Sequence, residues 1–273
     1  MSGDDATFPV GDYCARVGLI AADLGAEAPV ELVHAVAGAQ HRAIPFENLD
    51  IHRGDCVGVE PERLLARLIG ARRGGICYQL NGLLALALEA LGVPVQLWGA
   101  RVDAGSGAGP GRALGHMAAV VRDGPQSWRL VDVGFGGEFV WRRVDPADPE
   151  SLRIPVGTAS YLLDPRDRPL SAFADMARWH SSSPQSRFTG SVICTLPTAR
   201  GRTTLTGRPG AEGTLDYRLI RLRDGVRTEE PVTAAAATEL LAGDFGMPGA
   251  VAPAVSRVVD HENRQSVGNG SPR

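Results

Sequence analysis

Apolar residues recur at helical spacing through the first third of the chain. The pattern predicts four helices, over residues 12–24, 29–43, 61–69 and 77–91. The last stretch is the richest in leucine and stops before Gly92, which is typical of a buried helix with a glycine at its end. Between the second and third helices, Pro45 interrupts the pattern, and residues 44–51 are expected to form a connector or a short strand. The first third is therefore predicted to be a helical bundle.

Beyond Gly92 the pattern changes to that of strands separated by turns. Strand patterns occupy residues 93–102, 115–122, 127–133, 152–163, 190–196, 202–205 and 215–222. The Asp-Gly-Pro turn at 123–125 joins the second of these strands to the third and predicts a hairpin, and the glycine-rich residues 103–111 predict a loop. The strands together predict a barrel or two small sheets. A short helix capped by Thr233 is expected over 233–241, and the polar residues 260–273 are expected to be a disordered tail.

Composition narrows the class of protein without identifying it. The chain has 273 residues, of which 44% are hydrophobic and 22% charged, so it can bury a core as one large domain or as two to three smaller ones. The net charge of −3 gives no reason to expect a nucleic acid or an anionic membrane as partner. All 28 basic residues are arginine, which excludes a lysine nucleophile or Schiff base in this chain. No apolar run reaches the roughly 20 residues of a membrane span.

The cysteines lack metal-ligand or paired spacing, and no signal peptide is recognised before them. They are Cys14, Cys56, Cys77 and Cys194. We therefore expect reduced thiols and a cytoplasmic location.

Cys77 stands out because it falls at the first turn of the leucine-rich helix. The unpaired N–H groups and the positive dipole end at that position favour a thiolate, which is the nucleophilic form of cysteine. Gly74 and Gly75 precede it and would allow a backbone or a substrate to approach closely. The competing interpretation is a small apolar cysteine packed at a helix start.

The predicted hairpin supplies a base and a carboxylate that could activate such a thiol. With the turn centred near Gly124, His116 and Asp132 would lie directly opposite one another, within side-chain reach on one face. A cysteine nucleophile needs a base of this kind and a third group that orients the base. The alternatives are a half-buried strand histidine bonded to backbone and a carboxylate that caps a strand end.

The remaining histidines carry weaker signals. His34 and His41 are expected on the surface or core edge of a helix, His52 after a strand-like run, and His261 in the tail. Only His180, in the Ser/Pro-rich stretch after Trp179 that is expected to be a loop, is kept as a minor functional candidate.

Four motifs resemble, in their order and spacing, those of the arylamine N-acetyltransferases. They are Pro-Phe-Glu-Asn at 45–48, Arg-Gly-Gly-Ile-Cys-Tyr-Gln-Leu-Asn at 73–81, Gly-His-Met at 115–117 and Val-Asp-Val-Gly-Phe-Gly at 131–136. The likeness covers roughly residues 8–260 and implies a Cys77–His116–Asp132 triad. It also implies an α+β fold with a cysteine-protease-like core. The implied domains are a helical bundle over 1–92, a β-barrel domain over 93–195 and an α/β lid with the polar tail over 196–273.

The resemblance implies a two-step, ping-pong reaction. An acetyl group would pass from acetyl-CoA to Cys77 and then to the nitrogen of an arylamine, arylhydrazine or arylhydroxylamine, as in xenobiotic metabolism. No metal and no permanently bound cofactor is implied, since acetyl-CoA is a co-substrate. The partners would be these small molecules, with neither nucleic acid nor membrane, and the chain would be a monomer or a homodimer.

Binding residues follow from the same resemblance. The CoA-binding candidates are Trp98, Gly99, Ala113, Leu114, Gly115 and Thr203. The acceptor-binding candidates are Phe46, Ile76, Phe135, Gly136 and Phe139. Backbone amides of the glycine-rich residues 103–115 could hold a phosphate, or the segment is an ordinary loop. Core packing is the competing explanation for the three phenylalanines, and Glu47 and Asn48 are expected to make structural bonds.

Three other functions use the same features. An amide synthase of the same family would close a polyketide macrolactam with the same triad. A cysteine peptidase or transglutaminase-like enzyme shares the Cys, His, Asp order. A binding module with a decayed site would leave Cys77 no more reactive than an ordinary thiol.

Overall fold

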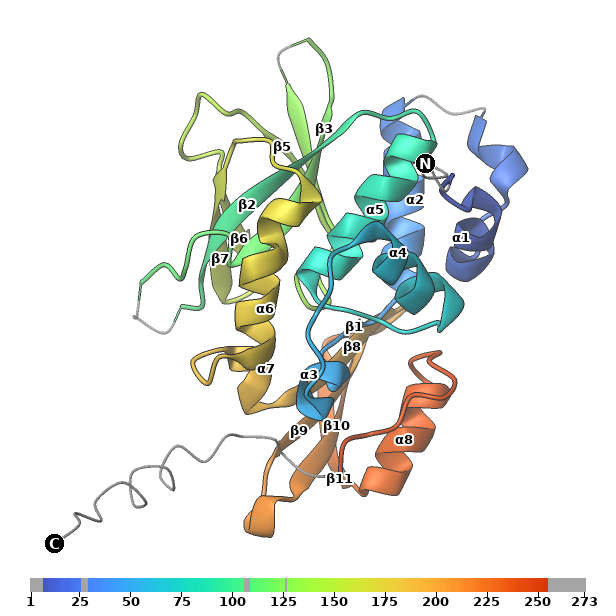
Figure 1. Cartoon of the computed structure of the whole chain (residues 1–273), viewed down its shortest axis with the longest axis vertical. Coiled ribbons are helices and arrows are strands. Elements are labelled where there is room, and N and C mark those ends of the chain that lie inside the picture. The colour runs from blue at the N-terminus through green and yellow to red at the C-terminus, as the bar shows by residue number, and fades with distance from the viewer. Residues whose placement is uncertain (1–6, 26–28, 106–108, 126, 255–273) are drawn as a thin grey trace, which may run out of the picture.

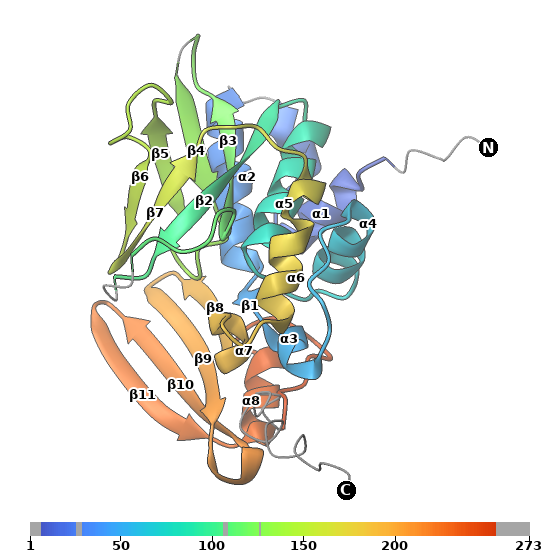
Figure 2. The same cartoon turned by 60° about the vertical axis from the view of Figure 1, so that its left-hand side comes forward.

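The computed structural model describes residues 7–25, 29–105, 109–125 and 127–254. They form an α+β fold in which two antiparallel sheets lie one above the other and most helices cover one side (Figures 1 and 2). The predicted fold class, with its cysteine-protease-like core, is confirmed.

The first sheet has six strands and is barrel-like, whereas the sequence predicted a barrel or two small sheets. Its strand order is β5-β4-β3-β2-β7-β6. The strands are β2 Val95–Asp103, β3 His116–Arg122, β4 Trp128–Asp132, β5 Val140–Val144, β6 Arg153–Val156 and β7 Ala159–Asp164. Its central strand β3 is buried along almost its whole length, from His116 to Val121.

The second sheet combines one strand from the first third of the chain with four strands from the last third. Its strand order is β1-β8-β9-β10-β11. The strands are β1 Phe46–Glu47, β8 Val192–Thr198, β9 Gly201–Pro209, β10 Leu215–Arg223 and β11 Val226–Val232. The boundary predicted between residues 195 and 196 falls inside β8, and β1 comes from the predicted helical bundle. The division into three domains stays a prediction.

Helices cover the first sheet and one side of the second. They are α1 Val10–Val17, α2 Pro29–Ala43, α3 Leu49–Arg53, α4 Pro61–Leu64, α5 Cys77–Ala90, α6 Ala174–Ser182, α7 Arg187–Gly190 and α8 Ala234–Ala242. Short helical turns occupy Ala21–Gly25, Leu65–Gly70, Leu170–Phe173 and Ala211–Gly213. Figure 2 shows α5 and α6 beside the upper sheet and α8 beside the lower one.

Helix α5 is the centre of the larger core. It packs on β3 and β2 and against α1, α2 and α4. Its buried leucines are at most 1% exposed: Leu80, Leu83, Leu84 and Leu88. Each such side chain contributes about 1.5–3 kcal/mol on burial, so the position of the helix start, and with it Cys77, is firmly fixed.

Three expected elements differ from the structure, and β5, β11 and α3 were not predicted. The strand pattern over 152–163 forms two strands, β6 and β7. The helix predicted over 12–24 ends at Val17, because Gly18 takes a left-handed conformation with φ of 77° and its N–H caps Cys14. The Ser/Pro-rich stretch expected as a loop is helical as far as Ser182 in α6, which Pro184 then follows. The helix capped by Thr233 is confirmed, whereas the predicted tail lies outside the described residues.

The hairpin forms, but its register differs from the predicted one by two residues. Ala119 pairs with Val131, and the loop is closed by a bond from Asp123 N to Ser127 O. The connection is thus longer than a turn centred on Gly124, so His116 and Asp132 are diagonal and not directly opposed. A shift of two residues preserves the face on which a side chain lies, and diagonal neighbours on one face remain within reach of long side chains.

Candidate active site

Cys77 is the first residue of α5, and the segment before it is held by β1. Glu47 N donates to Gly75 O at 3.0 Å, and Gly75 N donates to Pro45 O at 3.2 Å. A Cβ on Gly74 would lie 2.2 Å from Pro45 O, so this close approach requires glycine. This tight pairing fixes the position of Cys77, which is only 3% exposed and lies at the wall of a cavity.

A buried ion network anchors the same segment. Arg73 Nη2 donates to Glu47 Oε1 and to Asp50 Oδ1, both at 2.9 Å, and Arg67 Nη2 lies 2.5 Å from Glu47 Oε1. Burial alone would raise the pKa of Asp50, but the two guanidinium groups lower it overall. Glu47 therefore has the structural role expected of it.

Asn48 links β1 to a part of the chain far away in sequence. Its Nδ2 donates to Phe188 O at 2.9 Å and to Ser191 O at 2.8 Å, and its Oδ1 accepts from Ile193 N at 2.7 Å. This side chain ties the segment before Cys77 to α7 and β8, which form the opposite side of the cavity.

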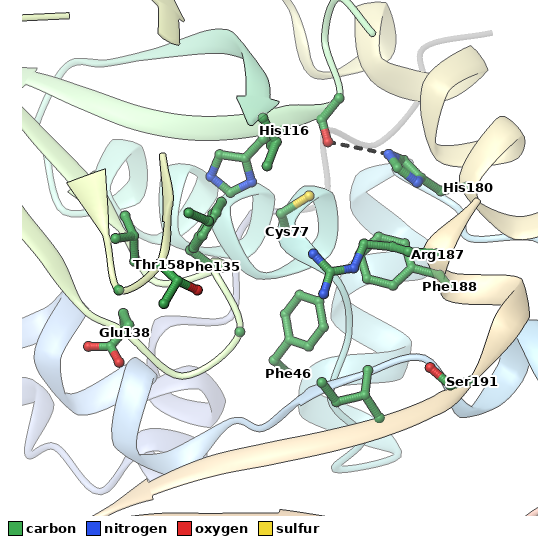
Figure 3. A pocket seen from close by; sticks show the side chains of 18 of the residues that line it. Phe46, Cys77, His116, Phe135, Glu138, Thr158, His180, Arg187, Phe188 and Ser191 are labelled. Carbon is green, nitrogen blue, oxygen red and sulfur yellow. Dashed lines mark hydrogen bonds between the residues drawn. The ribbon is translucent and has the colours of Figure 1, made fainter. Parts of the chain in front are cut away.

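The three predicted catalytic side chains lie together. His116 Nε2 lies 2.7 Å from Asp132 Oδ2, and both residues are buried. Because Nε2 faces Asp132, Nδ1 is the ring nitrogen left to interact with Cys77, whose side chain helps to raise the pKa of His116. Figure 3 shows Cys77 and His116 side by side on one wall of the cavity.

Asp132 accepts hydrogen bonds on both oxygens. Asn81 Nδ2 and Gly134 N donate to Oδ1, each at 2.8 Å, and the Tyr161 hydroxyl donates to Oδ2 at 3.0 Å, beside His116. Burial raises the pKa of Asp132, but the His116 charge and these donors outweigh it and lower the pKa overall. The carboxylate therefore stays ionised and can orient the imidazole.

Sequence reasoning missed Asn81 as a partner of the triad. It lies one helical turn after Cys77, and its Nδ2 also donates to Met117 O at 2.7 Å while its Oδ1 accepts from Val133 N at 3.0 Å. One side chain thus joins α5 to β3 and to the segment after β4. The signal was available, because positions four apart share a helix face.

The environment of His116 favours its charged form. Burial lowers its pKa, but the charge and hydrogen bond of Asp132, together with the nearby Cys77 side chain, raise it to about 10. Phe135 packs edge-on against the imidazole at 5.1 Å, and Tyr161 lies 4.9 Å from it. An imidazolium beside a sulfur stabilises a thiolate, so this arrangement can perform nucleophilic catalysis.

A cavity of about 570 Å³ opens in front of Cys77 and His116. It is lined by three of the predicted acceptor residues, Phe46, Phe135 and Gly136. The other two do not line it, since Ile76 is fully buried in the core and Phe139 packs against His34, His41 and Trp141.

Of the predicted CoA-binding residues, only Gly115 lines this cavity. Trp98 is 1% exposed and packs against Trp128, and Thr203 is buried in β9. Gly99 lies in β2 beside Leu114. Ala113 and Leu114 lie in the loop before β3, where Ala113 is exposed. Their roles stay predictions.

His180, expected in a loop, lies on α6 and lines the cavity opposite Cys77 (Figure 3). Its Nε2 bonds Gly115 O at 3.3 Å, and Tyr78, next to Cys77, donates its hydroxyl to Leu114 O at 2.7 Å. Leu114 has a left-handed φ of 57°. Two side chains therefore hold the strained backbone that precedes His116.

The described residues contain no cluster of three or more metal-ligating side chains, and none of their helices is long and apolar enough to cross a bilayer.

The chain is similar to known proteins along most of its length. A family model described as N-acetyltransferase matches residues 30–151. The arylamine N-acetyltransferase of Mycolicibacterium smegmatis is 42% identical over 137 residues, which are 47% of each chain, so this alignment spans about half of that relative. Mouse arylamine N-acetyltransferase 2 is 26% identical over 68% of this chain and 76% of its own length.

Solved structures extend the likeness to nearly the whole fold. The arylamine N-acetyltransferase of M. tuberculosis superposes with a TM-score of 0.72 and 26% identity, covering 88% of this chain and 94% of that one. The family model, the relatives and the solved structures agree, and each finds this chain similar to the arylamine N-acetyltransferases, a family of acyltransferases.

Proposed function

We propose that this protein transfers an acetyl group from acetyl-CoA to the nitrogen of an arylamine, arylhydrazine or arylhydroxylamine, with Cys77 carrying the acetyl group between them. The observation that carries the proposal is that Cys77 and His116 line one cavity together, with Asp132 bonded to His116 at 2.7 Å behind it. Similarity to the arylamine N-acetyltransferases supports the donor and the class of acceptor.

In the first half-reaction, the Cys77 thiolate attacks the thioester carbonyl carbon of acetyl-CoA. The tetrahedral intermediate collapses, the bond from that carbon to the CoA sulfur breaks, and the His116 imidazolium gives its proton to the departing thiolate. Free CoA leaves, and acetyl-Cys77 remains beside a neutral imidazole. Unpaired backbone N–H groups at the start of α5 are suited to stabilise the oxyanion.

In the second half-reaction, the amine nitrogen attacks the acetyl-Cys77 carbonyl. The neutral His116 accepts the proton that the nitrogen loses, the carbon–sulfur bond breaks, and the Cys77 thiolate returns beside an imidazolium. Asp132 holds the imidazole in the orientation that both steps need. Exchange between thioesters is nearly balanced and amide formation is downhill, so the scheme requires no ATP.

The binding roles belong to the same proposal. Phe46, Phe135 and Gly136 would contact the aromatic acceptor, as their place on the cavity wall supports. Gly115 and the loop before it would contact the donor near its thioester. The donor would bind only as a co-substrate, with no permanently held cofactor.

Incubation with acetyl-CoA followed by intact mass measurement tests the function. We expect one added acetyl group, located on Cys77 by peptide mapping and removed when an arylamine is added. A Cys77→Ser protein serves as control and should neither gain the group nor acetylate the amine. Normal arylamine acetylation by Cys77→Ser would refute the mechanism.

A further inference from the structure

One charged side chain of the cavity has no part in the proposed chemistry. Arg187 begins α7 and lines the same cavity as Cys77 and His116. Figure 3 shows its guanidinium extending from α7 into the space between Cys77 and Phe46, over the ring of Phe188. The guanidinium carbon lies 5.9 Å from the centre of that ring.

Arg187 differs from the other arginine on the cavity wall. Arg202 forms an ion pair with Glu138 at 3.1 Å. Among the described residues, no carboxylate lies within 4.0 Å of Arg187. Its charge therefore faces the cavity uncompensated, next to apolar aromatic walls.

The positive charge of Arg187 acts on His180, its neighbour on the same side of the cavity. Burial is the main cause that lowers the pKa of His180, and the charges of His116 and Arg187 lower it further, against the bond to Gly115. His116 is balanced by Asp132, whereas Arg187 has no such partner on the cavity wall. An anionic group on a ligand would be attracted to this end of the cavity.

We propose that Arg187 forms an anion subsite that holds the carboxylate of an acidic arylamine, such as an aminobenzoate, while its amino group attacks acetyl-Cys77. Phe46 and Phe188 flank the guanidinium and offer the apolar faces that an aromatic ring needs. A planar guanidinium binds a carboxylate through two parallel N–H···O bonds. The inference rests on the proposed function and adds the charge class of its acceptor.

The order of the reaction favours the acceptor as the source of the anion. In acetyl-Cys77 the sulfur carries no charge and His116 is neutral, so the charge of Arg187 is the one that remains to attract an anionic acceptor. The phosphates of CoA are the other possible source. They are separated from the thioester sulfur by the whole pantetheine arm, whereas Arg187 and Cys77 line the same cavity.

Steady-state kinetics with a matched pair of acceptors test the subsite. The pair is para-aminobenzoate and its neutral carboxamide, with the meta isomers as a second pair. For Arg187→Gln we expect kcat/KM to fall about tenfold with the carboxylates, the loss typical of one charge-assisted hydrogen bond, and to stay unchanged with the amides. Arg187→Lys should recover part of the loss. The control Arg200→Gln removes an exposed arginine paired with Asp224 outside the cavity and should behave as wild type.

A second experiment determines whether Arg187 binds the donor or the acceptor. Acylation of Cys77 is measured with acetyl-CoA and with a short acetyl thioester that carries no phosphate. If Arg187→Gln slows acylation by acetyl-CoA alone, the guanidinium binds CoA phosphates and the proposal is overturned. An equal loss with both members of the acceptor pair also overturns it.

Binding at the subsite can be measured without turnover. Benzoate should protect Cys77 from iodoacetamide in the wild type and lose this effect in Arg187→Gln, while benzamide shows no difference between the two proteins. This result would support the subsite even if no arylamine were acetylated, whereas equal protection in both proteins would contradict it.

Discussion

Two buried histidines line the same cavity and have opposite acid–base behaviour. Burial lowers the pKa of both, because it disfavours the charged form. At His116 the carboxylate of Asp132 and the Cys77 thiol reverse the effect and raise the pKa to about 10. At His180 the partners are a carbonyl and a hydroxyl, and the pKa falls to about 4. The partner of a buried histidine, and not its depth, decides whether it carries charge.

The two sides of the cavity also differ in the function that they suit. The side built from α5, β3 and β4 is buried and hydrogen-bonded throughout, which suits chemistry that needs fixed geometry. The side built from α6 and α7 carries a neutral histidine and an exposed arginine, which suits recognition of a ligand. Three predictions probe this comparison, in order of decreasing effect.

Replacing Asp132 by Asn should give His116 a lowered pKa, as His180 has. The carboxylate charge is lost, burial then dominates, and the pKa of His116 should fall below its ordinary 6.5. We expect acylation of Cys77 to slow by about 10³–10⁴-fold, the scale on which loss of an orienting carboxylate acts. Histidine NMR titration and stopped-flow acylation measure the two effects.

Asp175→Asn, an exposed carboxylate on α6, is the matched control and should change neither value. A raised pKa of His116 that survives in Asp132→Asn would show that Asp132 does not cause it.

Asn81→Ala should loosen the fixed side of the cavity while leaving the triad residues in place. It removes three hydrogen bonds and leaves the Met117 carbonyl and the Val133 N–H buried without that partner. We expect a loss of about 2–4 kcal/mol in the free energy of unfolding, measured with urea, together with slower acylation of Cys77. The exposed Gln185→Ala is the control. Stability equal to wild type would contradict the clamping role of Asn81.

His180 should contribute to stability in a pH window opposite to that of His116. Its folded pKa of about 4 lies below the ordinary 6.5, so the unfolded chain binds the proton first as the pH falls. Its contribution is complete above pH 6.5 and is lost as the pH falls toward 4, by up to about 3 kcal/mol. The contribution of His116 is complete below its ordinary 6.5 and is lost as the pH rises through about 10.

Urea unfolding across both windows tests these signs. His180→Gln should flatten the acidic part of the stability curve relative to wild type and leave the alkaline part unchanged. An acidic slope identical to that of the wild type would exclude His180 as its source.

The sequence by itself determined the elements that carry the chemistry. The leucine pattern after Cys77 placed that residue at the first turn of a buried helix, and the hairpin pattern placed His116 and Asp132 on one face of neighbouring strands. These features follow from periodicity and turn chemistry within short stretches of chain. The register was wrong by two residues because the loop length depends on backbone bonds that the sequence does not specify, although the face was right.

Only the tertiary structure decided which distant side chains meet at the site. Tyr161 reaches Asp132 from β7, and His180 and Arg187 reach the cavity from α6 and α7. Phe135 faces the cavity and Phe139 the core, although both are phenylalanines beside the triad aspartate. Local patterns specify an element and its faces, but which neighbour covers each face depends on packing among residues far apart in the chain.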